Sequence, residues 1–274
     1  MSLDPSRLIA VMNGLPPEAI WLITLLVCFA SILLLLRLFG AAGLFIYIAV
    51  AVIGANLQVL KLVQFSAFAN PVALGTILFS TTYLCTDILT EYYGVRTARR
   101  AVALGFSAYL LMTVLMLLTL GYRPLTAVEA GPDLAWALDT HGHLAGLFIP
   151  APAIFAAGMT AYLASQFHDV WMYRFIGRLT GGRWLWLRNN GSTLLSGLID
   201  NTIFSVLAFV VLAPQPVGLQ ALVFTFILGT YAIRVVVAVL DTPFLYLARR
   251  VIPRRPVADE PLSALRRGPA ESGA

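Results

Sequence analysis

Seven long apolar runs, separated by short segments that carry most of the charge, constrain what this chain can fold into. A helix needs about 20 consecutive apolar residues to cross the hydrocarbon core of a bilayer. The composition agrees, because 59% of the residues are hydrophobic and 11% are charged, whereas a soluble domain carries about 25% charge. The sequence therefore predicts an all-α, polytopic membrane helix bundle. The expected spans cover residues 19–38, 41–64, 71–92, 101–121, 145–167, 191–212 and 219–247.

The segments outside these spans are polar. We expect residues 1–18 to form a disordered N-terminal lead, residues 19–248 a single transmembrane transporter domain, and residues 249–274 a basic, disordered tail. Residues 122–144 read as a polar loop between two spans. Residues 168–190 combine four arginines with three tryptophans. That mixture is typical of a helix and loop at the membrane interface, where indole rings prefer the headgroup level.

Arginine is concentrated in alternate connections between the spans. Arg96, Arg99 and Arg100 follow the third span, four arginines separate the fifth span from the sixth, and six follow the seventh. Connections rich in Lys and Arg remain on the cytoplasmic side. The pattern predicts a multi-pass protein of the inner (plasma) membrane with its N-terminus outside and its C-terminus in the cytoplasm.

Several function classes are disfavoured by what the sequence lacks. It contains no P-loop, no GxGxxG, no HExxH and no nucleophile elbow. Cys28 and Cys85 are isolated within apolar runs, and the HxH pair of His141 and His143 is a weak metal signal. We therefore expect no enzymatic activity, no cofactor, no resident metal and no nucleic-acid partner.

The third span carries the most unusual polar residues of the chain. Tyr83, Asp87 and Glu91 are spaced four residues apart, so they share one face of a helix. An acid inside a membrane helix is costly, and by default it marks a functional site. Glu91 has an alternative interpretation, in which it lies at the cytoplasmic interface and pairs with Arg96 or Arg99. Asp87 lies one turn deeper, which favours a functional role.

The sixth and seventh spans also contain ionisable residues. Asp200 lies about ten residues from the cytoplasmic end of its span, or about 15 Å deep, so an ion pair with Arg234 is expected near the midplane. A midplane pair usually lines a polar pathway, although it can also be purely structural. Ser192 belongs to the same stripe as Asp200. Asp241 shares a face with Arg234, or else it serves the interface with Arg249.

These residues, with Asn56 and Lys61 of the second span, predict a polar site enclosed by a bundle. A central site of this kind is typical of transporters. A channel would require rings of like residues from several subunits, and the sequence leaves open whether the chain is a homo-oligomer. A structural assembly factor would not explain ionisable residues inside helices, and a membrane enzyme would require a nucleophile and base that are missing.

Four stretches resemble the YhhQ/VUT family of queuosine precursor transporters. They are TDILTEYYG followed by VRTARRA, then MTAYLASQFHDVWMYRF, GSTLLSGLIDNTIFSVLAF and YAIRVVVAVLDTPFLYLARR, in family order over about residues 50 to 250. The resemblance implies six family helices, so the span at residues 19–38 is an N-terminal addition. Family members often have Lys where this chain has Arg234, which retains the charge and changes the geometry.

The resemblance implies a function as well. Members of the family import 7-cyano-7-deazaguanine and 7-aminomethyl-7-deazaguanine for salvage into queuosine in tRNA. A 7-deazaguanine base and the lipid bilayer are then the expected partners. Matching the family motifs adds Gln166 and Asp169 to the candidates. The candidate substrate-binding residues are Asn56, Tyr83, Asp87, Glu91, Gln166, Ser192, Asp200, Arg234 and Asp241.

An alternative is that the chain is the substrate-binding membrane subunit of an energy-coupling-factor-type importer for a vitamin-like or nucleobase-like solute. Runs of alanine and other small residues, such as Ala41–Gly43, would suit docking onto a separate ATPase module. Association with ATPase subunits would distinguish this reading from an independent transporter. The sequence does not decide between them.

Overall fold

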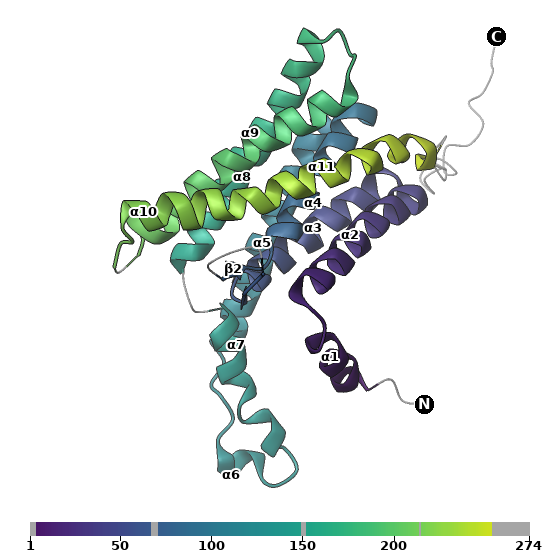
Figure 1. The fold of residues 1–274 in the computed structure, drawn as a ribbon. Coiled ribbons are helices and arrows are strands. Elements are labelled where there is room, and N and C mark those ends of the chain that lie inside the picture. Colours follow the sequence, from purple (N-terminus) through teal and green to yellow (C-terminus); the bar gives the residue numbers. More distant parts are fainter. Residues whose placement is uncertain (1–3, 67–70, 149–151, 214, 254–274) are drawn as a thin grey trace, which may run out of the picture.

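The computed structural model describes residues 4–66, 71–148, 152–213 and 215–253. Helix α4 (Thr76–Tyr92) lies at the centre of its helix bundle (Figure 1). Six further long helices in these residues pack against it. Their bounds are Pro17–Phe39 for α2, Ala41–Gln58 for α3, Val95–Leu120 for α5, Pro152–Leu179 for α8, Leu185–Val206 for α9 and Leu228–Val251 for α11. The expected all-α bundle is thereby confirmed.

Five of the helices in the described residues are long and apolar enough to cross a membrane. They are α2, α3, α5, α9 with its continuation to Val211, and α11 with its preceding turns from Leu219. The more polar helices α4 and α8 lie among them, and α8 packs extensively along α9. The chain is accordingly a multi-pass membrane protein.

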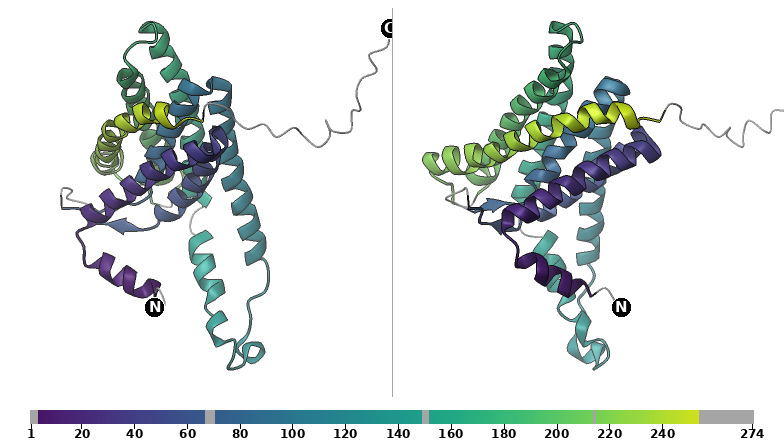
Figure 2. Two further views of the ribbon diagram at one scale, coloured as in Figure 1. Left: turned by 90° about the vertical axis from the view of Figure 1, so that its right-hand side faces the viewer. Right: turned by 45° about the vertical axis from the view of Figure 1, so that its right-hand side comes forward.

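Short elements connect these helices. Strands β1 and β2 form a two-stranded antiparallel hairpin between α3 and α4, in which Leu62 pairs with Ala73 and Val63 with Val72. Beyond α5, the chain forms short helices that extend away from the bundle in the views of Figure 2. The short elements are α1 (Pro5–Asn13), β1 (Leu62–Val63), β2 (Val72–Ala73), α6 (Ala127–Ala130), η1 (Ala135–Ala137), α7 (Thr140–Phe148) and α10 (Leu219–Ala221).

The bundle has two chemically different ends. The arginine-rich end contains the α2–α3, α4–α5 and α8–α9 connections and the last turn of α11. The hairpin end contains β1, β2, α6, α7 and the connection from α9 to α11. The arginine clusters that lie between spans are all at the arginine-rich end. Of the basic tail, residues 254–274 lie outside the described part of the chain.

Helix α4 is central although it is rich in threonine. Leu84 and Ile88 join the main apolar cluster, while Thr81, Thr82 and Thr86 are fully buried. A threonine hydroxyl can occupy a helix interior when it donates to a carbonyl of the preceding turn. The Thr82 hydroxyl does so to Phe79 at 2.6 Å, and Thr86 donates to Tyr83 at 3.0 Å. The helix can therefore be polar and buried at once.

Several expected boundaries differ from the structure. The second span ends at Gln58 rather than at residue 64, and the third begins at Thr76 rather than at residue 71, because the intervening chain forms the β hairpin. Gly75 ends that hairpin with a φ of 94°. The lead also contains a helix, α1, since Asp4 caps it through Ser6 N and proline occupies its first position.

The segment at 168–190 consists of the ends of two bundle helices and the turn between them. Helix α8 continues through it to Leu179 and α9 begins at Leu185, because inward-facing Asp169, Tyr173 and Asn189 are buried in the bundle. At the start of the expected fifth span the chain is divided between α7 and α8, and Pro150 lies outside the described residues.

Candidate functional site

A cavity of about 500 Å³ lies at the hairpin end, among α3, α4, α8, α9 and α11. Ligand pockets commonly have volumes of about 300–1,000 Å³, with apolar walls and a few polar groups that converge. This cavity matches that description. Its polar lining includes Asn56, Asp200, Asn201, Thr230 and Arg234, and its aromatic lining is Phe79, Phe204, Phe209, Phe224 and Phe226.

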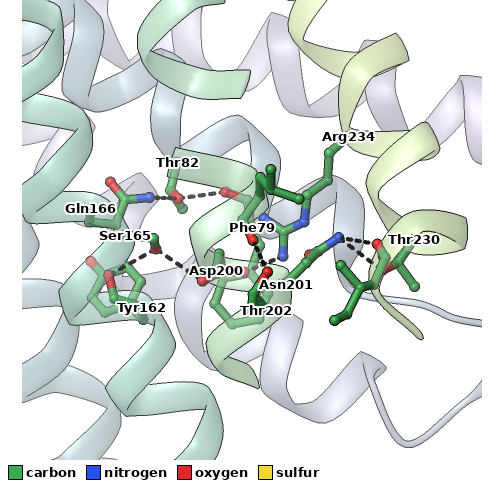
Figure 3. Close-up of polar contacts among 12 residues, drawn as sticks. Phe79, Thr82, Tyr162, Ser165, Gln166, Asp200, Asn201, Thr202, Thr230 and Arg234 are labelled. Atoms are coloured by element: carbon green, nitrogen blue, oxygen red, sulfur yellow. Dashed lines mark hydrogen bonds and ion pairs between the residues drawn. The ribbon is translucent and has the colours of Figure 1, made fainter. Parts of the chain in front are cut away.

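Asp200 and Arg234 form a salt bridge on the wall of this cavity, as Figure 3 shows. The Asp200 carboxylate also accepts a hydrogen bond from Ser165 Oγ at 3.0 Å. Both charged side chains are nearly buried, with exposed fractions of 9% and 10%. The ion pair between Asp200 and Arg234 that the sequence predicts is confirmed. It joins α9 to α11, and Ser165 adds α8 to the same group.

Arg234 retains unused hydrogen-bonding capacity. Its Nη2 donates to Asp200, while Nε and Nη1 are buried and have no hydrogen-bond partner among the described residues. Native proteins satisfy most buried polar groups, so unpaired donors call for an explanation. Because Arg234 lines the cavity, a polar ligand that drew its guanidinium toward the cavity would supply the missing acceptors.

The aromatic lining comes largely from two π-helical segments. One, η2 (Leu207–Val211), continues α9, and the other, η3 (Leu222–Ile227), precedes α11. Phe209 and Phe226 face each other there with ring centroids 4.2 Å apart. Single π-helical turns often occur at functional sites. The sequence reasoning missed these phenylalanines, because a change from α to π geometry leaves no signal in the apolar pattern.

Two asparagines complete the polar lining. The Asn56 amide donates to Val52 O at 2.8 Å, and the Asn201 amide donates to Ile227 O and Thr230 Oγ1 at 3.1 and 2.9 Å. The side chain of Asn201 thereby ties α9 to the start of α11. Asn56 was a sequence candidate, whereas Asn201 and Ser165 were missed although each adjoins a candidate, Asp200 and Gln166 respectively.

A group of buried polar residues lies behind the cavity, where α4 and α8 meet. We call this group the polar seam. Gln166 donates through Nε2 to Thr82 at 2.6 Å, and the Thr86 hydroxyl lies 3.2 Å from Gln166 Oε1 and 3.4 Å from Asp169 Oδ2. Tyr83 is almost completely buried beside the same seam. Gln166 and Tyr83 therefore lie next to the cavity lining but are not part of it.

Three carboxyl groups lie deeper along the seam. Asp87, Asp169 and Asp241 have exposed fractions of 0%. Asp241 accepts a hydrogen bond from Asn189 Nδ2 at 2.7 Å, rather than pairing with Arg249 at the interface. Ser192 is buried near them, and its hydroxyl donates to Asn189 O at 3.3 Å. The candidates Asp87, Ser192 and Asp241 are thus separated from the Asp200 cavity.

Glu91 lines a second cavity, of about 570 Å³, at the arginine-rich end. Its carboxylate accepts hydrogen bonds from Arg188 at 3.0 Å and from Tyr173 at 3.1 Å. The partner of Glu91 is therefore Arg188 of α9, and not Arg96 or Arg99 as one sequence interpretation had it. That interpretation considered only near neighbours in the chain, whereas α4 packs against α9.

The two cavities lie at opposite ends of α4. Phe79 lines one and Thr90 lines the other, so they are separated by about 16 Å along the helix axis. The buried seam occupies that interval. A closed region between two opposed cavities is compatible with alternating access, in which a transporter opens to one side of the membrane at a time.

Comparisons with known proteins agree with this architecture. A family profile described as "Putative vitamin uptake transporter" matches residues 73–248. The "Probable queuosine precursor transporter" of Bacillus subtilis (strain 168) is 35% identical over 238 residues, which cover 86% of this chain and 96% of that protein. No solved structure matches the chain. Since the profile covers more than half of the chain, this protein belongs to that family of membrane transporters, and it is a transporter rather than an enzyme.

Proposed function

We propose that this protein imports queuosine precursors, 7-cyano-7-deazaguanine and 7-aminomethyl-7-deazaguanine, for salvage into queuosine in tRNA. The substrate class rests on the relative from Bacillus subtilis, whose name describes a queuosine precursor transporter. The observation that carries the site is the pair of unsatisfied nitrogens, Nε and Nη1, on the Arg234 guanidinium in a cavity walled by phenylalanines.

The base and this cavity are chemically complementary. The ring presents N1–H and an exocyclic amine as adjacent donors, and a carboxylate can accept both. Asp200 has lone pairs left for them after its bonds from Ser165 and Arg234. Because carbon replaces nitrogen at position 7 of the ring, O6 and the nitrile nitrogen are the acceptors that Nε and Nη1 of Arg234 would meet.

The phenylalanines supply the surface on which the planar ring stacks. Phe79 of α4 and Phe204 of α9 are two of these lining residues. Stacking of a base on an aromatic side chain contributes about 1–3 kcal/mol. The proposed binding residues are accordingly Asn56, Phe79, Asp200, Phe204 and Arg234. The other sequence candidates would act in the seam or at the second cavity.

The import proposal predicts a change in tRNA. A strain that cannot make the precursor and lacks its own importer should regain queuosine when it expresses this protein and receives dilute 7-cyano-7-deazaguanine. Asp200→Asn should prevent recovery, because it removes the carboxylate for N1–H and the exocyclic amine. Asp133→Asn, on an exposed loop, should recover fully. Absence of queuosine despite wild-type protein in the membrane would overturn the proposed substrate.

We place the arginine-rich end in the cytoplasm and the Asp200 cavity on the outer face of the plasma membrane, following the distribution of arginine. Both native cysteines are buried, so a membrane-impermeant maleimide reports on introduced cysteines. Asp133→Cys should react in intact cells, and Arg183→Cys only after permeabilisation. The reverse pattern would invert the orientation.

A further inference from the structure

The buried acids Asp87, Asp169 and Asp241 are not explained by the proposed base-binding cavity. They come from three different helices, α4, α8 and α11, and none of them lines that cavity. All three side chains are completely buried. Burying one carboxylate without compensation is costly, and burying three together is more so.

Their hydrogen bonding is strongly deficient. Both carboxyl oxygens of Asp87, Oδ1 of Asp169 and Oδ2 of Asp241 have no hydrogen-bond partner among the described residues. Asp169 receives the long contact from Thr86, at 3.4 Å, and lies near the hydroxyls of Ser192 and Ser196 and the carboxyl group of Asp87. Asp241 receives the amide of Asn189. A buried carboxylate held permanently in its charged form would be expected to collect more donors than these.

The groups that face Asp87 do not compensate its charge. The charged groups that interact with Asp87 most strongly are themselves acids, namely Asp169, Asp241 and then Glu91. The cation Arg188 of α9 is committed to Glu91. The other titratable groups around the cluster are the phenol of Tyr173 from α8, the thiol of Cys85 from α4, and His168 of α8, which bonds to Ser196.

The remaining helices that pack against α4 add no cation to this cluster. From α2 and α3, Cys28 and Tyr47 face Cys85. The arginines of α5 are exposed at the arginine-rich end, and Arg234 of α11 is paired with Asp200. Among the residues that the structure describes, the cluster is a group of like charges with unsatisfied oxygens.

A bound proton resolves both the repulsion and the unsatisfied oxygens. When carboxyl groups adjoin in a buried site, one of them holds a proton, which it can donate to its neighbour. A metal ion is the other candidate, but the described residues contain no group of three His, Cys, Asp or Glu side chains arranged to hold one. We propose that Asp87, Asp169 and Asp241 form a proton-carrying site that couples import to the proton gradient.

Helix α8 links this site to the base-binding cavity. Ser165 bonds to Asp200 in the cavity, Gln166 bonds to Thr82 and Thr86, and Asp169 also contacts Thr86. A proton that arrives at Asp169 therefore changes the contact between α4 and α8 one turn from the residue that holds Asp200. Binding of the base and binding of the proton would act on the same pair of helices.

This proposal rests on the proposed function, and two measurements separate them. Purified protein alone, in liposomes, should accumulate labelled 7-cyano-7-deazaguanine when the lumen is alkaline. One pH unit sustains about tenfold accumulation if one proton crosses with each molecule. Asp87→Asn should abolish the accumulation while base binding and exchange across the membrane continue. Asp133→Asn should behave as wild type. Gradient-driven uptake by the purified chain alone would also show that no ATPase module is needed.

A measurement without substrate tests the cluster itself. Infrared spectra of the wild-type protein near neutral pH should contain the carbonyl stretch of a protonated carboxylic acid, and the Asp87→Asn spectrum should lose or shift it. Base binding with uptake that ignores the gradient would overturn the proton site and leave the substrate intact. Failure to bind the base, with the protonated carboxyl present, would overturn the substrate alone. A wild-type spectrum without that band would overturn the proton site.

Discussion

Replacing Arg234 with glutamine should abolish import and destabilise the protein. Asp200 would remain as a buried carboxylate, with Ser165 as its remaining donor among the described residues. Removing one member of a buried ion pair typically costs about 3–5 kcal/mol, because the other charge loses its compensation. The same change removes the two unpaired donors that we assign to the base. Both stability and binding should therefore fall.

Two companion variants identify the cause of the loss. Arg234→Lys retains the charge and loses the planar fork, so the protein should insert normally and import slowly. Arg250→Gln removes an exposed arginine from the same helix and should leave import unchanged. Queuosine in tRNA and thermal unfolding in detergent measure the two effects. Wild-type import by well-folded Arg234→Gln would exclude the guanidinium from the site.

Substituting alanine for Gly75 should lower both thermal stability and import. Gly75 has a φ of 94°, and a Cβ there would lie 2.5 Å from the carbonyl oxygen of Ala55 on α3. A left-handed backbone conformation costs an alanine about 1–3 kcal/mol, and the clash with main-chain atoms adds to it. Relief of the clash would move the hairpin away from α3, and with it one wall of the Asp200 cavity.

Gly181 provides a control in the connection between α8 and α9. Its φ is 59°, yet a Cβ there would meet no atom within 4 Å. Gly181→Ala therefore has the strain of a positive φ without the clash, so it should lower the unfolding temperature less and preserve import. Equal losses in the two variants would show that strain alone matters, and that the hairpin does not shape the cavity.

The sequence predicts the charged centre of the site well. Asp200 and Arg234 lie deep in apolar runs, where the cost of an isolated charge leaves mutual pairing as the simplest arrangement. The sequence also correctly predicts that Tyr83, Asp87 and Glu91 share a face of one helix. It does not predict that the three side chains on this face lie in three different parts of the protein. Four residues advance a helix by about 6 Å, so successive members lie beside the cavity, within the seam and at the second cavity.

Other features depend on structure that the apolar pattern does not encode. The two strands of the hairpin, residues 62–63 and 72–73, are apolar, so the sequence assigns them to the ends of the expected spans at 41–64 and 71–92. The partner of Glu91 is 97 residues away in the chain, so spacing favours nearby arginines instead. The phenylalanines of η2 and η3 face the cavity through π-helical turns, which change the direction of side chains without a change in composition.

Direct binding of the base to the purified protein in lipid nanodiscs tests the central claim. We expect saturable binding of 7-cyano-7-deazaguanine. The aminomethyl compound should bind more weakly, because its amine is a cation near neutral pH and would lie beside the Arg234 guanidinium. Adenine should compete poorly, because it has an amine where Arg234 requires the O6 acceptor and lacks the N1–H that Asp200 accepts. Absence of binding by folded wild-type protein, or equal competition by adenine, would contradict the assignment of this cavity to a guanine-like base.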